Sequence, residues 1–190
     1  MSGGAMNLRR WTRTNRWGLI ALVPMLALAM AVPVHDFYTQ RWKKQPHDPV
    51  AASAGGSVSY NHSTMTLVTL FRASGLQDFT GQPIAVPAGV AIWQAKLRFR
   101  STTPDAIGSC SMYLATTDGS TYDADPNELN ELGLNMEDLP YCLVATDEGG
   151  KALNDWTLTL YFLTPASAKP VGIQVNADRE LPGYALIKPA

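Results

Sequence analysis

The chain has 190 residues, which is enough for one domain with an appendage. Its 15 Lys and Arg residues nearly balance its 16 Asp and Glu residues, so the sequence offers no basic field for a nucleic-acid partner. With 13 prolines, 15 glycines and only 16% charged residues, it favours a β-protein with many turns over a helical bundle.

An uncharged apolar run extends from Trp17 to Val34, and four arginines precede it. As a helix it would span about 27 Å, close to the roughly 30 Å of a hydrocarbon core. The sequence therefore predicts a basic cytoplasmic N-terminus over residues 1–16 and a single transmembrane signal anchor over residues 17–34. The alternative is a signal peptide cleaved at Ala29-Met30-Ala31, which would give a secreted protein. The apolar run continues past that site, and this favours retention in the membrane.

Residues 35–56 contain two prolines and a run of small residues, Ala51 to Gly56. Such a composition cannot bury much apolar surface, so we expect a flexible stalk. The folded domain is expected over residues 57–190, outside the cytoplasm.

The domain contains two clear alternating patterns, Val90–Arg100 and Asp155–Leu163. In the first, apolar residues at odd positions alternate with mostly charged residues at even positions, as in a strand with one buried face. A third run, 66–73, would place Leu67, Thr69 and Phe71 on one face. Further short strands are expected at 57–60, 109–115, 141–145, 171–175 and 184–187, with one short helix within 126–134. Together these elements predict a mainly β fold, an antiparallel β-sandwich of 7–9 strands.

Two cysteines, Cys110 and Cys142, lie in the predicted domain. An even pair in a small β-domain suits an oxidising compartment, and a bridge closing roughly 30 residues would contribute about 3 kcal/mol or somewhat more. The alternative is two separate buried thiols. A zinc site is disfavoured, because neither cysteine has a Cys or His two to four positions away.

Three stretches carry a family resemblance: TGQPIAVPAGVAIWQAKLRFRS (80–101), MYLATTDGSTYDA (112–124) and WTLTLYFLTP (156–165). Over roughly residues 75–189 the chain resembles the DUF4352-like, telokin-like extracytoplasmic domains of bacteria, many of them membrane-anchored proteins or lipoproteins of actinobacteria and firmicutes. The resemblance implies an immunoglobulin-like architecture and says little about activity. Trp93 precedes both cysteines here, unlike the tryptophan of true immunoglobulin domains. No lipobox cysteine follows the apolar run.

The sequence contains no GxSxG, HExxH or P-loop pattern, so we expect no enzymatic activity and no resident cofactor. Seven carboxylates lie between Asp118 and Asp138. Asp123, Asp125 and Glu128 are the best candidates for a Ca²⁺ site, although the spacing is not that of an EF-hand. A solvated acidic loop is the favoured alternative.

These features together suggest a membrane-anchored extracytoplasmic binding or accessory module of the cell envelope. Its helix would contact membrane lipid, and its sandwich would bind an envelope protein or a glycan, with Tyr113, Tyr122 and Tyr141 as candidate surface residues. One alternative is a structural accessory subunit of a larger membrane complex. Another is a metal-dependent envelope hydrolase that uses the acidic loop.

Overall fold

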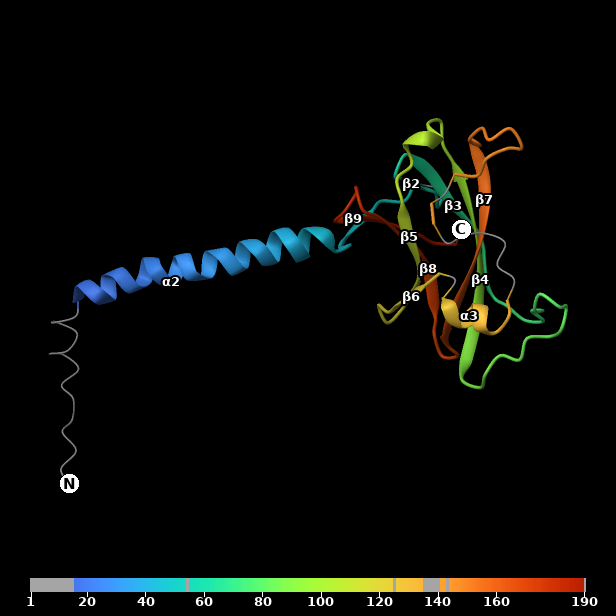
Figure 1. Cartoon of the computed structure of the whole chain (residues 1–190), viewed down its shortest axis with the longest axis horizontal. Coiled ribbons are helices and arrows are strands. Elements are labelled where there is room, and N and C mark those ends of the chain that lie inside the picture. The colour runs from blue at the N-terminus through green and yellow to red at the C-terminus, as the bar shows by residue number, and fades with distance from the viewer. Residues whose placement is uncertain (1–15, 54, 125, 135–140, 143, 190) are drawn as a thin grey trace, which may run out of the picture. The chain divides into compact units, whose positions relative to one another are not determined.

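The computed structural model describes residues 16–53, 55–124, 126–134, 141–142 and 144–189. The chain divides into two compact units, residues 1–45 and residues 46–190. The first unit is helical and the second is a β-sandwich (Figure 1).

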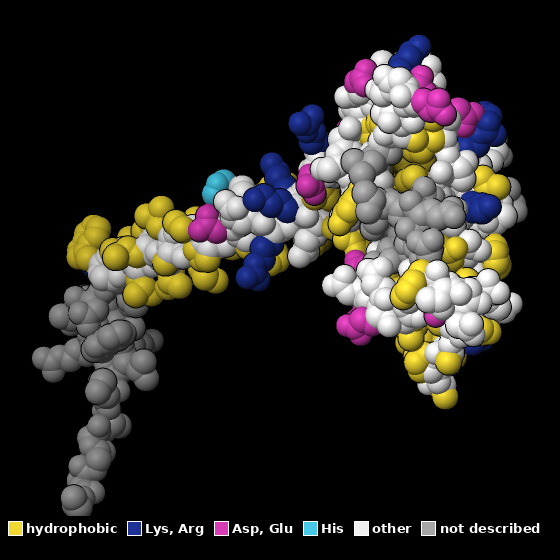
Figure 2. Space-filling view, turned by 45° about the vertical axis from the view of Figure 1, so that its right-hand side comes forward, with side chains coloured by type: hydrophobic (Ala, Val, Ile, Leu, Met, Phe, Trp, Pro, Cys, Tyr) yellow, Lys and Arg dark blue, Asp and Glu magenta, His cyan; other side chains and the backbone are white. Residues whose placement is uncertain are grey.

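The helical unit consists of α2 (Arg16–Asp36), a π-helical turn η1 (Phe37–Arg41) and a 3-10 turn η2 (Trp42–Lys44). The 21 residues of α2 rise about 31 Å, which is enough to cross a bilayer core. Figure 2 shows hydrophobic side chains along α2 and Lys and Arg side chains gathered where the apolar run ends. By length and composition, the segment from Arg16 to Lys44 is the one helix in the described part of the chain that could span a membrane. The expected N-terminal apolar helix is therefore confirmed.

The described part of the sandwich contains nine strands in two sheets, so the predicted fold class is confirmed. The five-stranded sheet has the order β1-β9-β8-β5-β6, and the four-stranded sheet has the order β2-β3-β4-β7. Neighbouring strands are antiparallel except β1 and β9, which are parallel. The strand bounds are β1 Asp48–Val50, β2 Val58–Tyr60, β3 Ser63–Arg72, β4 Val90–Arg100, β5 Cys110–Thr116, β6 Thr121–Asp123, β7 Asp155–Pro165, β8 Pro170–Ala177 and β9 Gly183–Ile187. The short helix α3 covers Asn127–Glu131.

The main core lies between the sheets and follows the alternation expected from the sequence. On β4, Ala95, Leu97 and Phe99 are fully buried, whereas Lys96 and Arg98 lie on the opposite, outer face. β4 is central because it pairs along its length with β3 and β7. The alternation is therefore sharpest on the strand that has a neighbour on both sides.

A second, smaller core covers one end of the outer face of the four-stranded sheet. Ile92 points to that outer face, yet it is only 1% exposed, because it packs with Leu129 of α3 and with Leu134. Partly buried side chains surround this cluster: Ala73, Leu76, Ile84, Leu132, Tyr161 and Leu163. Residues outside the strands therefore bury a position that the alternation assigned to solvent.

The expected faces of β3 require a correction. Its register with β4 shifts between Leu67 and Thr69, so the strand contains a β-bulge. One extra residue reverses the side-chain alternation beyond it. Leu67 is buried as expected, but Leu70 packs against the main core, and Phe71 is 46% exposed on the outer face.

Two local expectations also differ from the structure. Strand β1 lies within residues 35–56, the range expected to be a stalk, and pairs with β9 from Asp48 to Val50. The backbone N–H groups of His47 and Asp48 also donate to the Pro182 carbonyl. Three residues in a parallel edge pairing leave little signal in a sequence. The strand expected at 141–145 is reduced, among its described residues, to one bridge between Tyr141 and Ser111.

Candidate functional site

The outer face of the five-stranded sheet carries two of the three tyrosines expected at a binding surface. Tyr113 on β5 lies opposite Gln174 on β8 and is half-buried. Tyr141 bridges Ser111 of β5 and is 50% exposed. Ser111 and Tyr113 alternate with the buried Met112, so they point away from the core. Residues paired across antiparallel strands share one face, so Tyr141 points outward with them.

Tyr122 lies on the inner face, so its predicted place on the exposed surface is wrong. It pairs with Leu114, which is fully buried, and it packs partly buried against the main core. The register between β5 and β6 is set by the tight turn that joins them, and a shift of one residue exchanges the two faces. The sequence around Tyr122 does not reveal this register, so it could not show which face the side chain occupies.

The structure adds outward residues that the sequence did not single out. Ile173 and Val175 on β8 are buried, which places Gln174 and Asn176 outside. Ala185 and Ile187 on β9 are buried, which places Tyr184 and Leu186 outside. We call the resulting surface the tyrosine face, which consists of Ser111, Tyr113, Tyr141, Gln174, Asn176, Tyr184 and Leu186. The alternation of β8 could have identified its outward amides, but only the strand order brings them beside the tyrosines.

The two amide side chains on this face are connected. The Gln174 Nε2 donates to the Asn176 Oδ1 at 3.0 Å, which fixes the orientation of both groups. This bond uses one donor of Gln174 and one acceptor of Asn176. Among the described residues, the Gln174 Oε1 and the Asn176 Nδ2 make no side-chain hydrogen bond.

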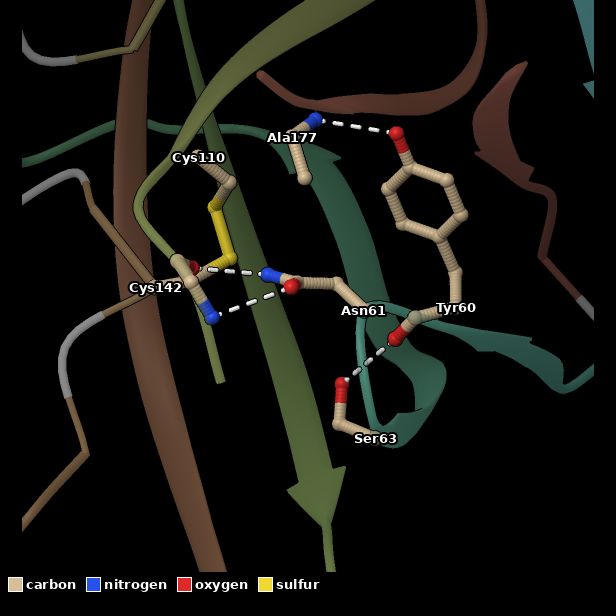
Figure 3. The surroundings of a disulfide bond; sticks show 7 residues. Tyr60, Asn61, Ser63, Cys110, Cys142 and Ala177 are labelled. Carbon is tan, nitrogen blue, oxygen red and sulfur yellow. Dashed lines mark hydrogen bonds between the residues drawn. A yellow bond between two sulfur atoms is a disulfide. The ribbon is translucent and has the colours of Figure 1, made fainter. Parts of the chain in front are cut away.

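A disulfide supports the tyrosine face from behind. Cys110 directly precedes Ser111, Cys142 directly follows Tyr141, and their Cα atoms are 5.3 Å apart. Both cysteines are buried in the main core (Figure 3). The expected bridge is confirmed, and it connects the segment that carries Tyr141 to strand β5.

An open groove of about 870 Å³ lies at the end of the sandwich where β2 turns into β3. Its lining includes Arg100, Asp155 and Glu180, so it carries charges of both signs, together with apolar surface. Two turn residues, Asn61 and His62, adopt positive φ angles of 50° and 58°.

Hydrogen bonds within the protein occupy the buried polar groups around this groove (Figure 3). Asn61 donates to the Gly108 carbonyl at 2.7 Å and accepts from the Gly108 N–H at 3.0 Å. The Tyr60 hydroxyl donates to the Gly183 carbonyl and accepts from the Ala177 N–H. Burial raises the pKa of Tyr60 above its ordinary value. This network holds the turn in place, so we assign it a structural role.

The acidic segment is described only in part. Asp123 is exposed at the end of β6 and Glu128 is exposed on α3, whereas Asp125 lies outside the described residues. The described residues contain no group of three or more His, Cys, Asp or Glu side chains arranged to hold a metal ion. The Ca²⁺ site therefore stays a prediction.

Asp118, at the start of this segment, is engaged in its own turn. Its carboxylate accepts from the Thr116 hydroxyl at 2.6 Å and from the Ser120 N–H at 3.1 Å. The hydrogen bond from Thr116 is the main reason that its pKa lies below the ordinary value. Asp118 thus shapes the β5–β6 hairpin.

No family model matches the chain, and no curated protein matches it. Among solved structures, an uncharacterized β-sandwich protein from Clostridium difficile 630 is similar over 77% of this chain and 98% of its own, with 8% identity and a TM-score of 0.39. The fold assignment rests on the two sheets described above.

Proposed function

We propose that this protein is a membrane-anchored binding module whose β-sandwich works outside the cytoplasm and contacts its ligand through the tyrosine face. The observation that carries the proposal is that face itself. It combines outward tyrosines with an oriented amide pair on a disulfide-supported sheet. Aromatic side chains on rigid strands offer contact area at little entropic cost. The proposal assigns no reaction to the protein.

The membrane anchor is supported by the helical unit. The described side chains of α2 are exposed, and the helix has no polar face that would suit packing against a soluble domain. Arg41, Lys43 and Lys44 follow the apolar run, and the Lys43 ammonium lies 5.3 Å from the Tyr38 ring centroid. Aromatic and basic residues at the end of an apolar helix suit a membrane interface.

The placement outside the cytoplasm is supported by the disulfide, because such bridges persist in oxidising compartments. The arginines before the apolar run favour a cytoplasmic N-terminus. We also propose that the domain is related to the DUF4352-like envelope domains and that the protein is located in the cell envelope.

Topology is tested on the full chain with a C-terminal tag, expressed in bacterial cells. We expect protease added to intact spheroplasts to remove the tag, and we expect the purified protein to retain the mass of the uncleaved chain. If the mass is instead that of a chain beginning after Ala31, the helix is cleaved and the secreted alternative is supported. A tag protected until the membrane is opened would overturn the proposed orientation.

The binding role is tested by pull-down from gently solubilised membranes. The full chain is compared with the double variant Tyr113→Ala, Tyr184→Ala and with Phe71→Ala, which removes an exposed aromatic ring from the other sheet. A partner retained by the wild type and by Phe71→Ala, but lost by the double variant, supports the proposal. A partner retained by all three and lost only when another apolar helix replaces α2 would instead support the structural-subunit alternative.

A further inference from the structure

The seven residues that define the tyrosine face are uncharged. They comprise three tyrosines, two amides, one serine and one leucine. On the described strands of this sheet, the charge nearest these residues is Asp123, which lies opposite Tyr113 at the end of edge strand β6. A ligand that depends on ion pairs, such as a nucleic acid or a polyanion, would find no Lys or Arg among these seven residues, although Lys188 is exposed just beyond the end of β9.

The available groups match the chemistry of a neutral sugar. A pyranose ring has one face of C–H groups that packs on an aromatic ring, and its rim of hydroxyls both donates and accepts hydrogen bonds. Here the Gln174 Oε1 is an oriented acceptor and the Asn176 Nδ2 is an oriented donor. The tyrosine hydroxyls and the Ser111 hydroxyl can do both.

The arrangement of the tyrosines favours an extended ligand. Tyr113 lies on β5 and Tyr184 lies on β9, with β8 and its amide pair between them. Neighbouring strands are about 4.8 Å apart, so the backbones of these tyrosines are separated by roughly 10 Å across the sheet. Tyr141 pairs with Ser111, and Ser111 pairs with Asn176, which the β8–β9 register places opposite Tyr184. Tyr141 and Tyr184 therefore end one row across the sheet, and Tyr113 lies two residues along β5 from this row, opposite Gln174. A chain of linked sugar rings that crosses the strands would meet ring, amide pair and ring in turn.

A protein partner fits the same surface less well. Tyrosines are frequent at protein interfaces too, but the centre of such an interface is generally an apolar patch that excludes water. Leu186 is the one aliphatic side chain among the members of the tyrosine face, and the centre of the face is the Gln174–Asn176 pair.

We propose that the tyrosine face binds a neutral polysaccharide chain. Tyr113, Tyr141 and Tyr184 pack against sugar rings, and Gln174 and Asn176 bond to sugar hydroxyls between them. The inference rests on the proposed function, because it names the ligand class of the same site.

The experiment is affinity electrophoresis of the full chain in mild-detergent micelles. The gels contain, one at a time, a soluble β-glucan, an α-glucan, a galactomannan and a xylan, with dextran sulfate as the anionic comparison. We expect at least one neutral polysaccharide to retard the wild type and dextran sulfate to have no specific effect. For that polysaccharide, Tyr113→Ala, Tyr184→Ala is expected to weaken binding at least tenfold.

Three further variants distinguish a binding role from a folding role. Tyr113→Phe retains the ring and should retain most of the binding. Gln174→Ala alters only a half-buried surface side chain and should weaken binding several-fold with an unchanged melting temperature. Phe71→Ala, on the opposite sheet, should bind as the wild type does.

Several results would overturn the glycan inference: no retardation by any neutral polysaccharide, equal retardation of the wild type and Gln174→Ala, or retardation by dextran sulfate alone. The pull-down then separates the two proposals. If the double variant loses a membrane partner while no polysaccharide binds the wild type, the binding module stands and its ligand is a protein. If neither assay responds to the face variants, both proposals fail.

Discussion

The two outer faces of the sandwich differ in their chemistry. On the outer face of the four-stranded sheet, β4 presents Lys96, Arg98 and Arg100, and Asp155 of β7 pairs with both arginines. The tyrosine face of the other sheet presents rings and amides in the same kind of alternating positions. Charged side chains keep a sheet face hydrated and discourage association, whereas uncharged aromatic ones leave it able to bind. The proposed binding role follows this difference, because it assigns the ligand to the face whose outward strand residues are mostly uncharged.

The disulfide next to the tyrosine face gives the largest expected effect, because it closes a long loop, with its cysteines 32 positions apart. Replacing both Cys110 and Cys142 with Ala should lower the free energy of unfolding by about 4 kcal/mol, as expected when a closed loop of this length is opened. Urea denaturation of the full chain in micelles measures the change. A reducing agent should shift the wild type to the same midpoint and leave the variant unaffected. A change below about 1 kcal/mol would show that the bridge restrains the unfolded chain little.

The second-largest effect on stability is expected in the smaller core, where α3 covers one end of the outer face of the four-stranded sheet. Leu129 of α3 is fully buried against Ile92, so Leu129→Ala should cost about 3 kcal/mol of stability. Glu131→Ala, on an exposed position of the same helix, is the matched control and should change the stability little. Equal effects of the two variants would mean that α3 does not contribute to a second core.

A smaller effect on stability is expected at Gly172, where β8 closely approaches the backbone that ends β9, next to the tyrosine face. A Cβ atom on Gly172 would clash with the Ile187 carbonyl oxygen, which is a backbone atom and cannot rotate away. Gly172→Ala should therefore cost about 1 to 3 kcal/mol and weaken ligand binding, because β9 carries Tyr184. Gly55→Ala, where the added atom meets nothing within 4 Å, is the control. A Gly172→Ala variant as stable as this control would show that the strands separate easily.

The sequence predicts the strands better than it predicts the faces. The β4 alternation, the apolar helix and the disulfide depend on local pattern, so they could be inferred and are confirmed. The inward position of Tyr122 and the outward position of Phe71 depend on hairpin register and on a bulge, which a pattern of period two does not contain.

The candidate site was predicted in part for the same reason. Tyr113 and Tyr141 were expected at a surface, and both lie on one face. Tyr184 and the Gln174–Asn176 pair were not expected, because they come from β9 and β8, which follow later in the sequence. Only in the folded sheet does β8 lie beside β5, with β9 next to β8. A binding face assembled across three strands becomes visible only when the strand order is known.

The ion pairs on the outer face of the four-stranded sheet, which we call the charged face, give the smallest expected effect on stability. This effect should depend on pH, whereas the contribution of the tyrosine face should not. The hydrogen bond from Arg98, with a second from Arg100, lowers the pKa of Asp155 to about 2. A carboxylate with a depressed pKa stabilises the fold above its unfolded pKa of about 3.9, and this contribution is lost as the pH falls toward the folded value.

Asp155→Asn should therefore lower the melting temperature at pH 6, and the difference from the wild type should shrink as the pH approaches 2. Because these side chains are partly exposed, 1 M salt should shrink it too. Lys96→Gln removes a charge from the same outer face without breaking these pairs, so its effect should not follow this titration. A difference between Asp155→Asn and wild type that stays constant from pH 6 to pH 2 would mean that the Asp155 side chain acts through packing, and the charged face would then owe little to its charges.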